Sequence, residues 1–137
     1  MGDLKTAWEA RFVYQRDYIA ADGRVKWKAF FDRRPPHNTS VDEHKLKATD
    51  IHWDAGVKIN PNRPLRGAAD ISEHEISRLG FTVLRTPSPL NRYHAEICGW
   101  PAGDTDADLR ECMAKAVSLA DASVFVAAPE TAQKGGK

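Results

Sequence analysis

The sequence predicts a single α+β domain built on a mainly antiparallel sheet with two or three helices. Three observations support this fold class. Short runs of alternating apolar and polar residues outnumber helical segments, they do not alternate regularly with helices as in a doubly wound sheet, and one long helix is expected near residues 106–120. We expect the domain to span residues 1–128 and a small, polar, disordered tail to cover residues 129–137.

The amino-terminal third is rich in aromatic and β-branched residues, with alternating runs at residues 12–15 and 25–30. Asp22-Gly23 lies between the two runs and supplies the positive φ angles of a tight turn. This region therefore predicts a β-hairpin. If the hairpin stands at the edge of the sheet, its free strand offers a surface through which two copies would pair as a homodimer.

The middle of the chain predicts shorter elements. Pro35-Pro36 places a loop at residues 33–38, because two prolines stop both a helix and a central strand. Residues 41–51 weakly favour a short helix capped by Thr39 or Ser40. A loop follows at residues 60–64, and residues 67–71 predict a short strand.

Capping residues and alternation make the later elements clearer. Ser72 opens a capping box with Glu75, and the helix that it begins should end at Gly80. Residues 81–85 and 93–100 predict two strands. On the second strand, successive residues face opposite sides of the sheet, which separates an apolar set from a polar one: Tyr93, Ala95 and Ile97 against His94, Glu96 and Cys98.

The longest predicted helix begins after Thr105, whose side chain should cap it above an acidic first turn. Its expected apolar stripe consists of residues spaced three and four apart: Leu109, Cys112, Met113, Ala116, Val117 and Ala120. Residues 123–128 are apolar except for Ser123 and predict a final strand in the centre of the sheet.

Composition limits the classes of function. The chain has 20 basic and 19 acidic residues and a net charge of +1, so no overall field favours nucleic acid or an anionic membrane. No stretch approaches the ~20 apolar residues that span a bilayer. Cys98 and Cys112 are the only cysteines, and we interpret them as buried thiols of a reducing compartment, with a disulfide or a reactive thiol as the alternatives. We therefore expect a soluble, cytoplasmic protein.

The strand at residues 93–100 carries the first candidate site. His94 and Glu96 leave the same face of a strand roughly 6 to 7 Å apart. An imidazole beside a carboxylate suits proton transfer, with His94 as the acid or base and Glu96 orienting it. The alternative is an ordinary solvent face of an amphipathic strand.

The segment at residues 37–42 carries the second candidate site. A loop that opens a helix presents free backbone N–H groups, which hold anions such as phosphate. His37 and Ser40 would supply acid/base or nucleophilic groups, with Asp42 orienting the imidazole. The alternative is a capped helix with an exposed histidine.

A series of arginines in the middle of the chain provides the third candidate: Arg63, Arg66, Arg78, Arg85 and Arg92. Arg85 and Arg92 flank the loop between two consecutive strands and would lie close together if those strands pair. Two guanidinium groups around one cavity suit phosphate or carboxylate binding, so we expect Arg85 and Arg92, together with His37, to bind the substrate. Arginines at strand ends are also ordinary solubilising residues.

Other features argue against metals and cofactors. The histidines lack the spacing of a zinc helix, so we expect neither a metal nor a cofactor. Lys26-Trp27-Lys28 interleaves basic and aromatic residues, as in proteins that bind single-stranded nucleic acid. In a strand, however, Trp27 would face away from both lysines, so we expect a core tryptophan and do not expect a nucleic-acid partner.

Two stretches together resemble a family of small bacterial proteins of uncharacterised function. One is Ala29-Phe30-Phe31, followed nine residues later by Ser40-Val41-Asp42. The other is residues 91–97, Asn-Arg-Tyr-His-Ala-Glu-Ile, which is similar to an Asn-Pro-x-His-x-Glu pattern except that Arg92 stands in place of the proline. The resemblance covers roughly residues 29–101 and implies no activity. It implies that Ser40 and His94 meet in one cleft.

The sequence carries no signature that decides whether the protein is an enzyme. The first hypothesis is a small domain that handles a phosphate-bearing or nucleotide ligand in a cleft formed by His94, Ser40 and an arginine. The second is a non-catalytic protein-interaction module, such as a component of a stress, toxin or defence system. A pocket that contains all three residue types would favour the first hypothesis.

Overall fold

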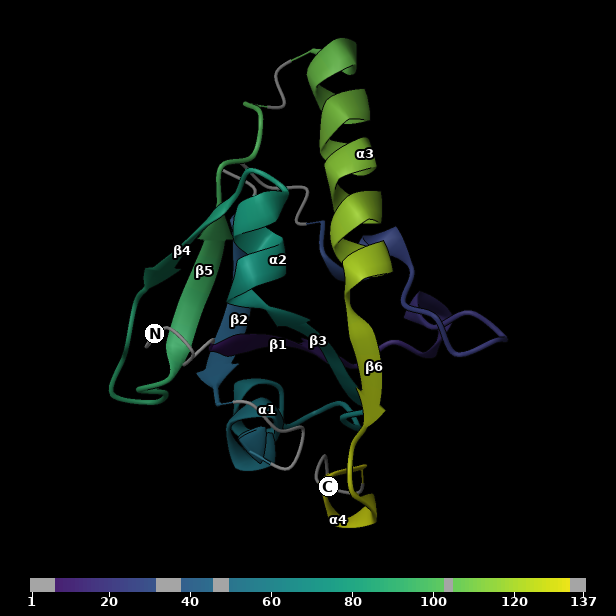
Figure 1. Ribbon diagram of the computed structural model, residues 1–137. Helices are drawn as coiled ribbons and strands as arrows, with labels where there is room; N and C mark the ends of the chain where they lie inside the picture. The colour runs from purple at the N-terminus through teal and green to yellow at the C-terminus, as the bar shows by residue number, and fades with distance from the viewer. Residues whose placement is uncertain (1–6, 32–37, 46–49, 103–104, 134–137) are drawn as a thin grey trace.

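The computed structural model describes residues 7–31, 38–45, 50–102 and 105–133. Figure 1 shows a twisted sheet crossed by helices on both sides. The strands are β1 (Trp8–Val13), β2 (Thr39–His44), β3 (Gly67–Ser72), β4 (Thr82–Arg85), β5 (His94–Cys98) and β6 (Val124–Ala127). The α-helices are α1 (Trp53–Ile59), α2 (Glu73–Arg78), α3 (Asp106–Ala122) and α4 (Glu130–Gln133), and two 3₁₀ helices are η2 (Arg16–Tyr18) and η3 (Trp27–Ala29).

The six strands form one sheet in the order β4-β5-β2-β1-β3-β6. Every neighbouring pair is antiparallel. The predicted α+β class, the antiparallel sheet and the long helix near residues 106–120 are therefore confirmed.

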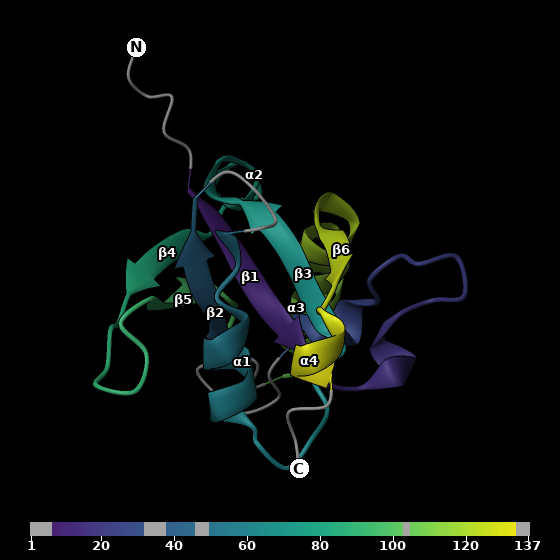
Figure 2. The same cartoon turned by 90° about the horizontal axis from the view of Figure 1, so that it is seen from below.

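Helices cover the two faces of the sheet unequally. Figures 1 and 2 show α2 and the long α3 on one side and α1 and α4 on the other. The α2–α3 side holds the main core, which combines sheet residues such as Val41, Ile71 and Ile97 with Ile76 of α2 and Leu119 of α3. The α1–α4 side has only small apolar clusters around Ala10 and Leu65. Its sheet surface also carries buried polar residues.

Two predicted capping residues are confirmed. The Ser72 hydroxyl accepts a hydrogen bond from the Glu75 backbone N–H at the start of α2. The Thr105 hydroxyl accepts one from the Asp108 N–H at the start of α3. Each cap satisfies an N–H group that lacks a partner within its own helix.

The predicted amino-terminal hairpin is only partly correct. Gly23 adopts φ 90° in the expected turn, and an isolated bridge joins Ile19 to Val25 across it. The flanking segments are 3₁₀ helices rather than strands, and β1 begins earlier, at Trp8. Because β1 lies in the centre of the sheet between β2 and β3, it provides no edge for strand pairing between copies.

The helix predicted to begin at Val41 is wrong, since residues 39–44 form β2. Thr39 and Val41 are buried on the core side, and β2 pairs with both β1 and β5. Burial and pairing with two neighbours override a weak helical pattern. The sequence also gave no signal for α1, which follows this segment.

The carboxy-terminal part differs from prediction in three ways. β6 lies at the edge of the sheet, not in its centre. On α3, the predicted stripe is half wrong, because Leu109, Met113 and Val117 are exposed while Leu119 is buried. The exposed residues are spaced four apart and share one face of the helix, while Cys112, Ala116, Leu119 and Ala120 form the buried face. The segment predicted as a tail begins with α4, in which Ala132 is buried.

Among the described residues, no helix is long and apolar enough to cross a membrane.

Candidate functional site: a pocket where two strands diverge

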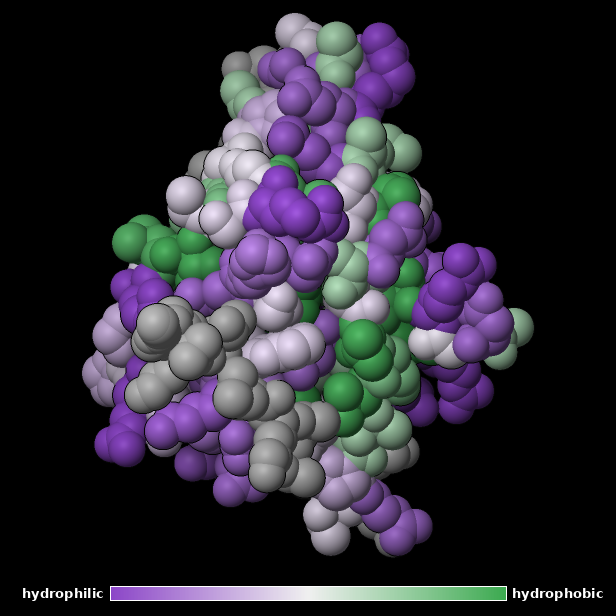
Figure 3. Space-filling view, viewed as in Figure 1, coloured by the Kyte–Doolittle hydropathy of each residue, from purple (hydrophilic) through white to green (hydrophobic). Residues whose placement is uncertain are grey.

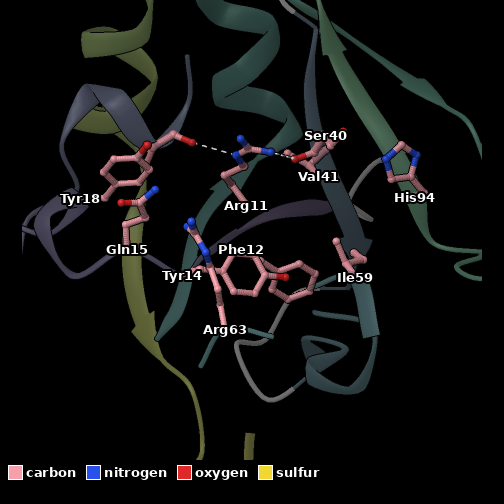
Figure 4. Close-up of a pocket in the computed structure, with 11 residues that line it drawn as sticks. Arg11, Phe12, Tyr14, Gln15, Tyr18, Ser40, Val41, Ile59, Arg63 and His94 are labelled. Atoms are coloured by element: carbon pink, nitrogen blue, oxygen red, sulfur yellow. Dashed lines mark hydrogen bonds between the residues drawn. The ribbon is translucent and has the colours of Figure 1, made fainter. Parts of the chain in front are cut away.

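The candidate site is a pocket of about 240 Å³ at the point where β1 and β2 separate. The two strands pair only from Trp8↔His44 to Ala10↔Asp42. Beyond that point β1 continues along β3, and β2 continues along β5. Beyond Ala10 and Asp42, β1 and β2 therefore no longer pair with each other. The gap that opens between them forms the pocket (Figure 4).

Arg11 lies across this gap and joins its two sides. Its Nε donates to the Ala29 carbonyl at 2.8 Å, and its Nη1 donates to the Ser40 carbonyl at 2.9 Å (Figure 4). The Ser40 carbonyl lies beyond the end of the β1–β2 ladder, so the guanidinium takes the place of a strand neighbour. Arg11 therefore fixes the shape of the pocket, and its charge lies at the pocket wall.

Aromatic side chains form much of the remaining wall. Phe12, Tyr14 and Tyr18 line the pocket from β1 and the segment that follows it. The Tyr14 hydroxyl donates to the Gly56 carbonyl of α1, and burial raises the pKa of Tyr14 to about 12. Tyr14 is thus a neutral hydrogen-bond donor that ties α1 to the pocket rim. Arg63, from the loop after α1, completes that rim and is exposed.

Ser40 and His94 both line this pocket, as Figure 4 shows. Register explains their proximity, because Ser40 pairs with Glu96 and Asp42 pairs with His94 on the β2–β5 ladder. Paired residues share a face, so Ser40, Glu96 and His94 lie on one side of the sheet, with Ser40 and His94 as diagonal neighbours roughly 7–8 Å apart at their Cα atoms. The sequence-based expectation that Ser40 and His94 meet agrees with this placement.

The contacts of His94 and Glu96 indicate what these side chains can do. The Nδ1 atom of His94 lies 2.7 Å from the Thr86 hydroxyl and 3.2 Å from the Thr86 carbonyl. Glu96 accepts a hydrogen bond from Asn38 at 3.3 Å. In the described part of the chain, neither His94 nor Glu96 is hydrogen-bonded to the Ser40 hydroxyl. The geometry supports contact with a ligand rather than an activated serine nucleophile.

The residues predicted to bind the substrate lie elsewhere. Arg85 forms ion pairs with Glu43 at 2.8 Å and with Glu73 at 2.9 Å, on the α2 side of the sheet. The guanidinium of Arg92 lies 5.4 Å from the Tyr93 ring centre, beside a second groove. His37 lies outside the described residues. Arg11 and Arg63 stand in the pocket instead.

Two buried polar pairs lie on the sheet face next to the pocket. Asp42 Oδ1 accepts a hydrogen bond from Asn91 at 2.6 Å, and burial raises the pKa of Asp42 although that bond opposes the shift. His44 Nε2 lies 2.6 Å from Asp70 Oδ1, with both side chains almost completely buried. Within the described residues, Asp42 Oδ2 and His44 Nδ1 are buried without a hydrogen-bond partner.

A third polar group lies on the opposite face. Glu9 is fully buried next to Glu73 and Glu43, and neither of its carboxyl oxygens has a hydrogen-bond partner in the described part of the chain. Burial, followed by the adjacent Glu73, raises the pKa of Glu9 to about 10, against a weaker opposing effect of Arg85. Glu9 is therefore neutral at pH 7. Across the described ranges, no three His, Cys, Asp or Glu side chains are arranged to hold a metal ion.

The Lys26-Trp27-Lys28 segment is not a strand with two different faces. Trp27 lies in η3, is half-buried, and packs against the core with its ring centre 6.0 Å from that of Phe31. The expectation of a core tryptophan agrees with this packing. Lys28 reaches back over the same ring at 6.0 Å.

Charge distinguishes the pocket from the rest of the surface. Arg11, Arg63 and His94 contribute to its lining, and of the residues described no aspartate or glutamate does so. The protein as a whole has almost equal numbers of acidic and basic residues, so this local imbalance is not a result of composition. With Ser40 and Gln15 as uncharged donors, the pocket can bind an anion through several N–H and O–H groups at once.

Sequence reasoning missed Arg11 and Tyr14 and noted Arg63 only as one of a series. A signal for Arg11 was present. If β1 is taken to begin at Trp8, Glu9 and Arg11 lie on the same face of the strand as the buried Val13, and the apolar residues between them lie on the other face. A charged residue on the core face of a strand needs specific hydrogen-bond or ion-pair partners, so its position indicates a structural or functional role.

Comparison with models of protein families, with curated proteins and with solved structures gave no match. The resemblance of residues 29–101 to a family of small bacterial proteins therefore stays a prediction.

Proposed function

We propose that the protein binds a small ligand carrying a phosphate or carboxylate group, in the pocket between β1 and β2. The observation that carries this proposal is the lining of the pocket, where Arg11, Arg63 and His94 occur without an acidic residue among those described. Because Arg11 is already bonded to two carbonyl groups, it contributes positive charge and rigidity. Arg63, at the exposed rim, is the residue that would contact the anion directly.

The aromatic wall favours an organic anion over a free inorganic ion. Phe12, Tyr14 and Tyr18 offer an apolar surface beside the charged groups, as ligand pockets generally do. A nucleotide has both a ring for that surface and a phosphate for Arg63 and His94. The role of Ser40 is then to donate its hydroxyl hydrogen bond to the ligand.

Binding, rather than a particular reaction, is the function that the geometry supports. Among the residues that the structure describes, no base is hydrogen-bonded to the Ser40 hydroxyl, as nucleophilic catalysis would need. A cytoplasmic location belongs to the same proposal, and the two free thiols of Cys98 and Cys112 support it.

Titration of the ¹⁵N-labelled protein with AMP and with pyrophosphate, followed by NMR, tests the proposal. We expect saturable chemical-shift changes at the backbone amides of the pocket residues Arg11, Ser40, Arg63 and His94. At the same ionic strength, AMP should bind more tightly than pyrophosphate. Replacing Arg63 with Gln should weaken binding at least about tenfold, since a charge-assisted hydrogen bond contributes about 1.5–3 kcal/mol.

The matched control is Arg110→Gln, which removes the same charge from the exposed surface of α3. It should leave the affinity unchanged within a factor of two or so. Equal weakening by both variants, or the lack of any saturable shift at low salt, would contradict an anion site in this pocket.

A further inference from the structure

The outer edge of β6 has no strand neighbour among the residues that the structure describes. β6 is the last strand of the sheet and pairs only with β3 among the described strands. Its sequence, Val-Phe-Val-Ala, contains neither a charge nor a proline. Natural sheets normally protect an edge with charged residues, proline or a covering element, because unpaired N–H and C=O groups attract another strand.

The opposite edge strand shows that protection, and β6 does not. β4 ends at the charged residue Arg85, whose guanidinium is held by Glu43 and Glu73, whereas β6 has no charged residue along its length. On β6, Val124 is 60% exposed and Ala127 is also exposed. Figure 3 shows hydrophobic residues gathered over β6 on the face in view.

The hydrogen-bond pattern identifies which groups of β6 point outward. The Ala128 N–H donates to the Arg66 carbonyl, so Ala128 points towards β3. Hydrogen-bonding direction alternates along a strand, so Val126 and Val124 also point towards β3. The backbone N–H and C=O groups of Phe125 and Ala127 therefore face away from the sheet.

We propose that β6 pairs with β6 of a second copy of this chain, antiparallel about a two-fold axis at Val126. In this register Phe125 of one chain stands opposite Ala127 of the other, and each such pair exchanges two N–H···O=C bonds. Four backbone bonds join the copies, and the two Val126 side chains meet on one face as a closely spaced pair. A two-fold interface must be self-complementary, and this edge satisfies that condition with no charge to repel its equivalent.

The helix that precedes β6 in the chain, α3, also exposes apolar side chains. α3 leads into β6 through Ser123 alone, and it exposes Leu109, Met113 and Val117. These three and Val124 are half of the eight large apolar side chains that are exposed in the described part of the molecule. An edge of four residues is short, so we expect a dimer in the micromolar range that dissociates on dilution.

Sedimentation velocity over a series of protein concentrations measures the assembly. We expect a shift from monomer to dimer as the concentration of the full chain rises through the micromolar range. Val124→Lys, which places a charge on the edge, and Ala127→Pro, which removes an outward N–H but no bond to β3, should each shift the midpoint at least tenfold higher. Leu84→Lys is the matched control on the other edge, where Leu84 is 55% exposed, and it should leave the midpoint unchanged.

Hydrogen exchange of the wild-type chain tests the same proposal without any substitution. The amides of Phe125 and Ala127 should exchange more slowly at high concentration than at low concentration, while those of the β4 edge should not change. A chain that stays monomeric at every concentration overturns the proposal. So does a dimer that Leu84→Lys weakens as much as Val124→Lys, or one in which the exchange of Phe125 and Ala127 is independent of concentration.

Discussion

The guanidinium of Arg11 donates to the backbone carbonyl of Ser40 at 2.9 Å, across a gap where neither residue has a strand neighbour on that side. This contact links a structural requirement of the fold to the candidate site. Two strands that diverge leave carbonyl groups unpaired, and the side chain that satisfies one of them also brings a positive charge into the opening. Removal of Arg11 should therefore affect both stability and binding.

Replacing Arg11 with Met retains much of the apolar stem but leaves the Ala29 and Ser40 carbonyls without their donor. We expect the free energy of unfolding to fall by about 2–4 kcal/mol, because each lost bond involves a charged group. Urea denaturation monitored by tryptophan fluorescence measures this change. Arg16→Met, at an exposed residue of η2, is the control, and an equal loss there would show that the two bonds of Arg11 contribute little.

Glu9→Gln should stabilise the protein increasingly as the pH rises. Burial raises the pKa of Glu9 to about 10 in the folded protein, against 4.5 ordinarily, so the folded state retains a proton that the unfolded state has released. Between these values the wild-type protein therefore loses stability with rising pH, and below about pH 4.5 there is no loss. Glutamine does not titrate and removes this dependence.

The gain from Glu9→Gln should grow by at most about 1.4 kcal/mol per pH unit. Unfolding measured in urea at pH 5, 7 and 9 provides the comparison, with exposed Glu111→Gln on α3 as the control. A gain from Glu9→Gln that does not change with pH would show that Glu9 is ionised in the folded protein.

Breaking the buried pair of His44 and Asp70 should cost more than removing it. Asp70→Leu leaves His44 buried with neither ring nitrogen hydrogen-bonded, and we expect a loss of about 3–5 kcal/mol. The double variant His44→Phe/Asp70→Leu should recover part of that loss, since no polar group is then left unsatisfied. Thermal and urea unfolding of the two variants decides between these outcomes. A double variant less stable than Asp70→Leu would refute the explanation.

Gly67→Ala should destabilise the junction between β3 and β6. An added Cβ at Gly67 would lie 2.4 Å from the Val126 carbonyl oxygen and 2.5 Å from the Phe125 ring. Because one of these atoms belongs to the backbone, the strands must move apart, and we expect a loss of about 1–3 kcal/mol. Gly67→Ser, which adds the same Cβ, should be equally unstable. A stable Gly67→Ala protein with unchanged exchange at the β6 amides would contradict this packing.

Local signals in the sequence predicted the elements that depend on local chemistry. Ser72 and Thr105 were identified as caps because capping is an interaction within four residues. The two faces of β5 were predicted because alternation is visible along one strand. Elements that depend on distant partners were not predicted. β2 resembles a weak helix until β1 and β5 are placed beside it, and α1 has no signal of its own.

The candidate site shows the same division. His94 and Ser40 could be brought together from their residue types and a short resemblance, and register explains why they meet. Arg11 had a local signal, as a charged residue on the core face of a strand, but that it lies in a pocket with Arg63 follows only from where β1 leaves β2. Arg85 was expected in the site because it flanks a loop, but the carboxylates that hold it come from Glu43 and Glu73, far away in the sequence.

The position of β6 also affects how the sheet is completed during synthesis. β3 acquires its outer neighbour only when residues 124–127 are available, 55 residues after β3 itself, which ends at Ser72, has been made. Until then Ala68 and Asp70 present an open row of backbone groups. At ordinary rates of synthesis of about 5–20 residues per second, this edge of β3 stays unpaired for several seconds. During that time the nascent chain on the ribosome must avoid pairing this edge with another strand.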